Sequence, residues 1–308
     1  MKRRLKVAYL RQYPDYRQDF VFNLIGSLHP GGIEITSPRT CDLLIIGPFS
    51  QRFLKYKPRL KTLLKLSLAG RRNPPRTLHQ TGENTRWNAI PADFSISLDL
   101  GVSDPNHFRF PLWMSMFDWS REGFQAPEIG RFGPLVEIEQ VMRPIGRPGG
   151  RLDHAVFFSS YMKEPRVSLL NAVKELMEVD CYGAAFRRTT LPGRRERFTK
   201  MEVSRDKTFA LCPENSMYPG YYTEKIPDAF ACGCIPITWC DSNVRHDFNP
   251  RALINMADFA DTGYVEGLRE AIQPRAIEEL RSHPLLLKRP SLDGIKGFLL
   301  RVLDGLSS

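Results

Sequence analysis

The sequence predicts an α/β protein of two domains, each built around a mostly parallel sheet. Short apolar runs of strand length alternate along the chain with stretches whose apolar residues recur at helical spacing. The chain has 308 residues, which is enough for two domains of ordinary size. The segment 141–151, VMRPIGRPGGR, is rich in proline and glycine and poor in apolar residues, as an interdomain linker is. We therefore place the domains at 1–146 and 147–308.

Composition indicates a globular protein with an anionic partner. The chain is 42% hydrophobic and 25% charged, and its net charge of +10 favours phosphorylated ligands, anionic membrane surfaces or nucleic acid. Nucleic acid is the weakest of these partners, because the sequence has no binding motif and no regular basic–aromatic pattern. We expect no nucleic-acid partner.

The first domain is predicted from a series of apolar runs. Cys41 to Phe49 is nearly continuous, as in a strand covered on both faces. Residues 51–72 mix leucines with basic residues; they favour a helix that covers the sheet, with a basic helix on an anionic membrane as the alternative. The other predicted elements are strands at Lys6–Leu10, Arg76–Gln80 and Asp93–Leu98, and a helix from Phe20 to Leu28.

The second domain begins with a predicted strand at His154–Ser160. A helix over Lys163–Met177 and a strand over Val179–Gly183 follow. Residues 261–306 have a helical pattern and are expected to close this domain, with packing back on the first domain as the alternative.

The stretch from Thr208 to Trp239 has the order strand, polar loop, helix, strand. Thr208–Cys212 and Ile235–Trp239 are the strands, Thr223 is the expected helix cap, and Gly233 ends the helix. In an open parallel sheet such a loop lies at the carboxyl end of a strand, where ligands bind. A helix start followed by Lys225 outlines a phosphate site. An ordinary strand–helix–strand unit with a solvated lysine explains the same spacing.

This stretch resembles the signature of glycosyltransferase family 10, the α-1,3/1,4-fucosyltransferases. Pro213 departs from the pattern, because the family usually has an aromatic residue there. The resemblance implies the GT-B fold, α/β with two Rossmann-like domains and an interdomain cleft. It rests on Phe209, Glu214-Asn215-Ser216, Tyr221, Thr223-Glu224-Lys225-Ile226, Asp228-Ala229 and Ile235-Pro236-Ile237.

The function that the resemblance implies is transfer of fucose from GDP-fucose to a hydroxyl of a saccharide, with inversion at the anomeric carbon. The acceptor would be a surface glycan or an oligosaccharide, and the linkage of the α-1,3 type. No cofactor is expected, and the sequence has no Asp-x-Asp pair to hold a metal. Transfer of another GDP-sugar and a non-catalytic nucleotide- or glycan-binding module are the alternatives.

The resemblance also assigns site residues. Glu83, in the segment Thr81-Gly82-Glu83-Asn84, would be the catalytic base. Lys225 and Arg187 would bind the donor diphosphate, with Arg188 as a rival to Arg187. Glu224 and Tyr221 would hold the ribose or the GDP edge, and Asn215 would shape the pocket.

Cysteine usage and hydropathy favour a cytoplasmic protein. Most of the six cysteines lie in apolar strands, as buried thiols do in a reducing compartment. Cys232 and Cys234 lack the partners of a metal site. No stretch approaches the ~20 apolar residues that span a bilayer, and the run Val7–Leu10 is too short for a signal peptide. Peripheral contact of the protein with the inner membrane is the alternative.

Overall fold

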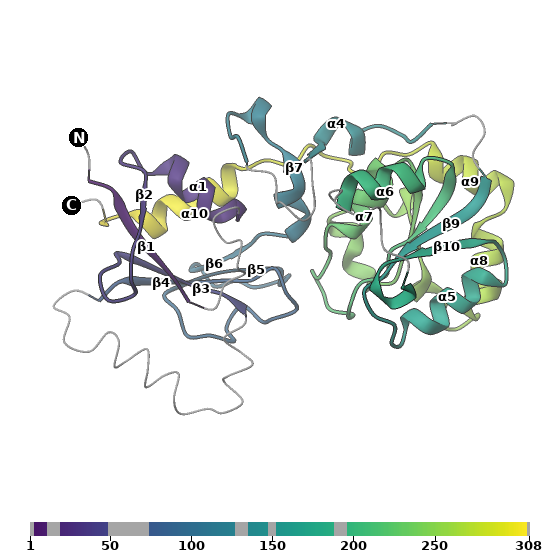
Figure 1. The fold of residues 1–308 in the computed structure, drawn as a ribbon, viewed down its shortest axis with the longest axis horizontal. Helices are drawn as coiled ribbons and strands as arrows, with labels where there is room; N and C mark the ends of the chain where they lie inside the picture. Colours follow the sequence, from purple (N-terminus) through teal and green to yellow (C-terminus); the bar gives the residue numbers. More distant parts are fainter. Residues whose placement is uncertain are drawn as a thin grey trace. The chain divides into compact units, whose positions relative to one another are not determined.

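The chain folds into two compact units. The structure, a computed structural model, describes residues 3–10, 19–48, 74–126, 135–146, 152–187 and 196–306. The first unit comprises Met1–Ser115, Trp119–Pro127 and Ser291–Ser308, and the second comprises Met116–Asp118 and Glu128–Pro290 (Figure 1). The helix expected at 51–72 lies outside the described residues.

The first unit contains a six-stranded parallel sheet of order β2-β1-β3-β4-β5-β6. Its strands are β1 (Leu5–Leu10), β2 (Ile33–Ile35), β3 (Leu43–Ile46), β4 (Arg76–Gln80), β5 (Phe94–Ser97) and β6 (His107–Arg109). The structure confirms every strand predicted for this domain to within a few residues. β2 was not predicted, because its three residues, with Glu34 in the middle, are too few to form an apolar run.

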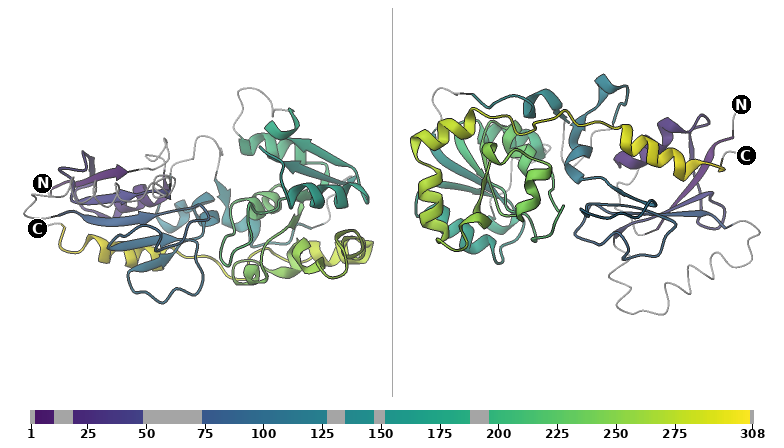
Figure 2. Two further views of the ribbon diagram at one scale, coloured as in Figure 1. Left: turned by 90° about the horizontal axis from the view of Figure 1, so that it is seen from below. Right: turned by 180° about the vertical axis from the view of Figure 1, so that it is seen from behind.

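Two helices, α1 (Phe20–Leu28) and α10 (Asp293–Leu303), lie side by side against this sheet (Figures 1 and 2). Asp19 caps α1, because its carboxylate accepts the Phe22 N–H at 3.0 Å. The same carboxylate accepts the Gln80 side-chain amide, at 2.9 Å to each oxygen, which ties α1 to the end of β4.

The helix α10 belongs to the first unit and not, as the favoured interpretation of 261–306 had it, to the second. Its Phe298 packs against Phe94 and Phe108, with ring centroids 6.0 and 5.5 Å away. Arg76 of β4 donates to the carbonyl of Val302 at 2.8 Å. Burial of Phe298 against the first sheet therefore decides which unit α10 joins, although α10 follows the second unit in the sequence.

The predicted boundary at 146/147 also differs from the structure. The short strands β7 (Phe117–Asp118) and β8 (Val136–Glu137) pair with each other within the second unit. The helix α4 (Ile138–Val141) follows, and the Val141 carbonyl accepts the Leu286 N–H at 3.0 Å. The proline- and glycine-rich segment therefore begins inside the second unit.

The second unit holds a five-stranded parallel sheet of order β10-β9-β11-β12-β13. The helices α6 and α7 lie on one side of it, and α5 and α8 on the other (Figure 1). The strands are β9 (Leu152–Phe158), β10 (Val179–Tyr182), β11 (Lys207–Leu211), β12 (Ile235–Thr238) and β13 (Ile254–Asn255); the helices are α5 (Arg166–Lys174), α6 (Glu196–Ser204), α7 (Lys225–Ala231), α8 (Tyr264–Ala271) and α9 (Pro274–Arg281).

The strand order of this sheet reverses at β9. From β9 the chain passes to β10 on one side and then to β11 on the other. Open α/β sheets bind ligands at such a switch point, outside the carboxyl ends of the two strands. The loops after β9 and β11 are therefore where a ligand is expected.

None of the described helices is long and apolar enough to cross a membrane.

Candidate functional site

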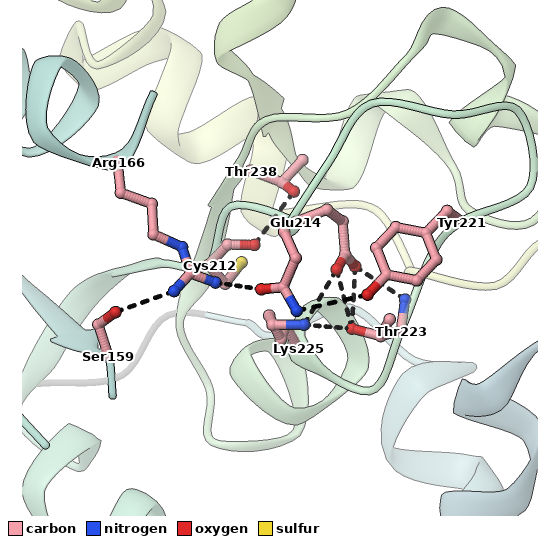
Figure 3. Close-up of polar contacts among 9 residues, drawn as sticks. Ser159, Arg166, Cys212, Glu214, Tyr221, Thr223, Lys225 and Thr238 are labelled. Carbon is pink, nitrogen blue, oxygen red and sulfur yellow. Dashed lines mark hydrogen bonds and ion pairs between the residues drawn. The ribbon is translucent and has the colours of Figure 1, made fainter. Parts of the chain in front are cut away.

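A buried carboxylate organises the loop that follows β11. Glu214 has no exposed surface, and its oxygens accept the Thr223 N–H at 2.7 Å and the Thr223 hydroxyl at 3.0 Å (Figure 3). The Lys225 ammonium donates to the same carboxylate at 3.0 Å. A buried carboxylate is tolerated only with such partners. Glu214, to which sequence reasoning gave no role, therefore fixes the turn that carries Lys225.

Lys225 retains capacity for a ligand. Its ammonium has three hydrogens, and Glu214 and the Thr223 hydroxyl, 2.6 Å away, accept two of them. The side chain is 23% exposed. Burial alone would lower the pKa of Lys225, but the nearby Glu214 and Glu224 carboxylates raise it above its usual value. The lysine is therefore charged at neutral pH and keeps one N–H for another partner.

The helix after this loop begins later than predicted. Thr223 does not cap it, because its hydroxyl is held by Glu214; α7 begins at Lys225, and Glu224 precedes it without a side-chain capping bond. Burial would raise the pKa of Glu224, but the charges of Lys225 and Lys200 lower it below its usual value. Glu224 is thus a carboxylate at neutral pH.

Arg166 is a buried cation that only neutral groups of the described residues contact. It is the first residue of α5, after β9, and is only 6% exposed. Its Nη1 donates to the Ser159 hydroxyl at 3.0 Å and to the Tyr161 carbonyl at 3.4 Å, and its Nη2 donates to Asn215 Oδ1 (Figure 3). All these acceptors are neutral, and no carboxylate in the described part of the chain forms an ion pair with Arg166. Buried charges in proteins are normally paired, so this position favours an anionic ligand.

Asn215 connects the loops after β9 and β11. It accepts from Arg166, and its amide donates to the Tyr221 hydroxyl at 3.4 Å. The resulting group, which we call the switch-point cluster, brings together the predicted Asn215, Tyr221 and Lys225. Its members are Arg166, Glu214, Asn215, Tyr221, Thr223 and Lys225.

Arg187 is not a member of this cluster. It follows β10 after a single 3-10 turn, is exposed, and has a left-handed backbone with φ of 51°. Its rival Arg188 lies outside the described residues. Sequence reasoning missed Arg166, although its place was informative: it opens the helix after the first strand of the second domain, where a switch point is expected.

Glu83 lies at the carboxyl edge of the first sheet, in the turn after β4, as predicted. Its N–H donates to the Thr81 hydroxyl at 3.0 Å, and the residue is half-buried. Nearby, the buried Asp99 accepts the Trp87 N–H at 2.8 Å and pairs with Arg86 at 3.0 Å. The role of Glu83 as the catalytic base stays a prediction.

All six cysteines are free thiols. Burial raises the pKa of Cys212, at the end of β11, well above the usual value, and the Glu214 charge adds to this effect. Within the described ranges, no group of three or more His, Cys, Asp or Glu side chains could hold a metal ion.

Comparison with known proteins identifies the segment that carries the cluster. Residues 152–271 match the family described as "Glycosyltransferase family 10 (fucosyltransferase) C-term". An alpha-(1,3)-fucosyltransferase of Helicobacter pylori is 38% identical over 106 residues, which are 34% of this chain and 20% of that protein. The match thus spans about a fifth of the curated relative.

Two solved structures share the fold. A crystal structure of alpha1,3-fucosyltransferase has a TM-score of 0.69 at 21% identity and covers 99% of this chain and 92% of its own. A crystal structure of alpha1,3-fucosyltransferase with GDP-fucose has a TM-score of 0.65 at 19% identity, and the match covers 98% of this chain and 91% of the other. The predicted α/β fold of the GT-B type is confirmed.

Proposed function

Because residues 152–271 match the model of glycosyltransferase family 10, we propose that the chain transfers fucose from GDP-fucose to a hydroxyl of a saccharide, with inversion and α-1,3 linkage. The observation that supports it most is Arg166, a buried guanidinium at the switch point of the sheet that forms no ion pair with a carboxylate of the described residues. A diphosphate supplies the missing negative charge and matches a guanidinium fork.

The donor half of the reaction depends on the switch-point cluster. Arg166 and the remaining N–H of Lys225 bind the diphosphate and stabilise the charge that develops as GDP leaves with the bonding electrons. Glu224 accepts hydrogen bonds from ribose hydroxyls, while Tyr221 and Asn215 shape the pocket. Arg187 remains a second candidate for the diphosphate. Because these positive charges are fixed in the protein, we expect no cofactor.

The acceptor half of the reaction needs a base. Glu83 removes the proton from the acceptor hydroxyl. At the same time the acceptor oxygen bonds to the anomeric carbon of fucose, and the bond from that carbon to GDP breaks. Its place at the end of a strand, in a segment like that of the bacterial family members, supports this role.

A glycan array with GDP-fucose tests the proposal. We expect release of GDP and a mass gain of one fucose residue on a subset of saccharides. Faster turnover with another GDP-sugar would favour the alternative donor. Binding of GDP without hydrolysis or transfer of any GDP-sugar would favour a non-catalytic module.

We also propose that the protein is cytoplasmic and touches an anionic membrane peripherally. The net charge of +10 supports this. Flotation with vesicles should show binding to anionic lipid that salt reverses, and none to neutral lipid.

A further inference from the structure

The side chain of Tyr161 lies against Arg166. The guanidinium carbon is 4.4 Å from the centroid of the tyrosine ring. The Tyr161 carbonyl accepts from the Ser159 hydroxyl at 2.6 Å and from Arg166 Nη1 at 3.4 Å. The residue is 40% exposed, a large aromatic side chain at the surface of the loop between β9 and α5. Tyr161 therefore contacts Arg166 through both its ring and its backbone.

The groups that hold Arg166 are all neutral. They are a hydroxyl, a carbonyl, an amide and an aromatic face. A carboxylate would orient the guanidinium as well, but it would compete with an anionic ligand for the charge. The face of an aromatic ring attracts a cation and carries no net charge. Arg166 is thus fixed in place with its charge still available.

The hydrogen bonds of Arg166 leave two N–H groups for a ligand. A guanidinium has five N–H groups; Nη1 uses two and Nη2 uses one. The Nε–H and the second Nη2–H have no partner among the described residues. Both groups are charge-assisted donors that suit phosphate oxygens.

We propose that Tyr161 is a positioning residue that acts on the donor diphosphate through Arg166: its ring covers one face of the guanidinium and fixes the plane in which the two remaining N–H groups lie. The inference rests on the proposed function for the identity of the ligand. The nearby Lys163 provides a control, because its ammonium lies 5.3 Å from the same ring centroid and the residue is exposed.

A comparison of GDP with inorganic pyrophosphate, which has no nucleobase, separates positioning of the diphosphate by Tyr161 from contact of Tyr161 with the base. Calorimetry on the full chain should show that Tyr161→Phe, which keeps the ring, changes both dissociation constants by less than about 2-fold. Tyr161→Leu should weaken both ligands equally, by about 3- to 10-fold, the usual worth of a partly exposed cation–π contact. Weaker GDP binding with unchanged pyrophosphate binding would overturn the proposal and show that the ring stacks on the base.

A double-mutant cycle tests whether the effect passes through Arg166. In an Arg166→Gln background, Tyr161→Leu should change GDP binding by less than about 2-fold, because the cation that the ring positions is gone. A full, additive loss would contradict the proposal. Lys163→Gln in the otherwise unchanged chain should also have less than a 2-fold effect; a loss as large as that of Tyr161→Leu would assign the effect to surface charge.

The contact itself can be measured without a ligand. The Nε–H resonance of Arg166 should show a ring-current shift in the unchanged chain and in Tyr161→Phe, and lose it in Tyr161→Leu. If the unchanged chain binds neither GDP nor pyrophosphate, the proposed function fails, and the resonance still decides the contact. If GDP binds and the resonance is the same in Tyr161→Leu, only the present inference fails.

Discussion

At the scale of single residues, the proposed donor chemistry depends on the two cations of the switch-point cluster, Arg166 and Lys225. Arg166→Ala and Lys225→Ala should each weaken GDP binding by about 1.5–3 kcal/mol, or roughly 10- to 150-fold, because each removes a charge-assisted contact. Arg187→Ala is the matched variant, and on geometry we expect a smaller effect from it. Calorimetry showing a larger loss for Arg187→Ala than for Arg166→Ala would return the diphosphate contact to Arg187.

Glu83 is the residue with the largest proposed role in the acceptor half. Glu83→Gln keeps size and polarity but cannot accept the proton of the acceptor hydroxyl. GDP-fucose should bind almost normally, since the cluster that we assign to it does not include Glu83, and turnover should fall by about 10²–10⁴-fold. Initial rates at saturating donor measure this.

Near-normal transfer by Glu83→Gln would direct the search to Asp99. That buried carboxylate lies just past the end of β5, beside Arg86. Asp93 is a poor candidate, because it precedes β5 and accepts from Thr77 at the opposite edge of the sheet. Asp118 belongs to the second unit.

Sequence reasoning found the residues of the loop after β11 and missed their partners. Asn215, Tyr221 and Lys225 lie close together in the chain, so a motif reveals them. Arg166 precedes Asn215 by 49 positions and meets it only because β9 and β11 are neighbours in the sheet. Glu214 looked like part of a polar loop, and only its complete burial shows that it holds Thr223 and Lys225.

At the scale of elements, α10 should stabilise the first unit. Phe298 is 1% exposed and touches two strands of the first sheet, so Phe298→Ala should cost about 3–5 kcal/mol. Leu300 of the same helix is 51% exposed, and Leu300→Ala should cost less than about 0.5 kcal/mol. Chemical unfolding measures both.

Hydrogen exchange distinguishes the two assignments of α10. In Phe298→Ala the amides of β5 and β6 should exchange faster, while those of β9 and β11 keep their protection. Faster exchange in β9 and β11 instead would support the boundary at 146/147, with α10 in the second unit.

Two histidines make the first sheet sensitive to pH. His79 and His107 lie on one face of β4 and β6, each in register with Ser95 of β5. Burial lowers the pKa of both, and the Asp99 charge opposes this only in part. As pH falls below about 6.5, the unfolded chain takes up protons before the folded one, so stability is full above that pH and falls below it.

The loss should reach at most about 1.4 kcal/mol per histidine for each pH unit. His79 Nδ1 bonds the Ile46 carbonyl at 3.0 Å, and His79→Asn keeps a donor near that position. Urea unfolding at pH 7.5 and 5.5 should show a smaller loss of stability for His79→Asn than for the unchanged chain. Equal losses in the two proteins would remove His79 as a cause.

Elements with runs of apolar residues were the most predictable. β3 (LLII) and β11 (KTFAL) match their predictions, because each contains at least three consecutive apolar residues that are buried. α6 was missed, since its sequence ERFTKMEVS continues a basic stretch and its hydrophobicity is low. The start of α7 was wrong by one residue, because Thr223 donates its hydroxyl hydrogen bond to the Glu214 carboxylate and does not cap the helix.

At the scale of the whole molecule, the fold class was predictable and the strand order was not. Alternating strands and helices predict a parallel sheet. The positions of β1 and β9, each between its two sequence successors, depend on crossovers that periodicity does not encode. Those crossovers create the switch point and so bring Arg166 to Asn215. The site is therefore a product of topology as much as of the motif.

The same topology predicts how the proposed transfer reaction depends on metal ions. Arg166 and Lys225 are fixed cations at the starts of α5 and α7, which follow the neighbouring strands β9 and β11, so we expect the protein alone to stabilise the leaving diphosphate. Turnover of GDP-fucose should persist in excess EDTA, with some stimulation when divalent ions bind GDP itself. In Lys225→Ala a divalent ion should stimulate more than in the unchanged chain, because metal-bound GDP replaces part of the lost charge. Rates in EDTA and in Mg²⁺ for both proteins test this. Activity that vanishes in EDTA and returns only with metal would show that these cations do not suffice.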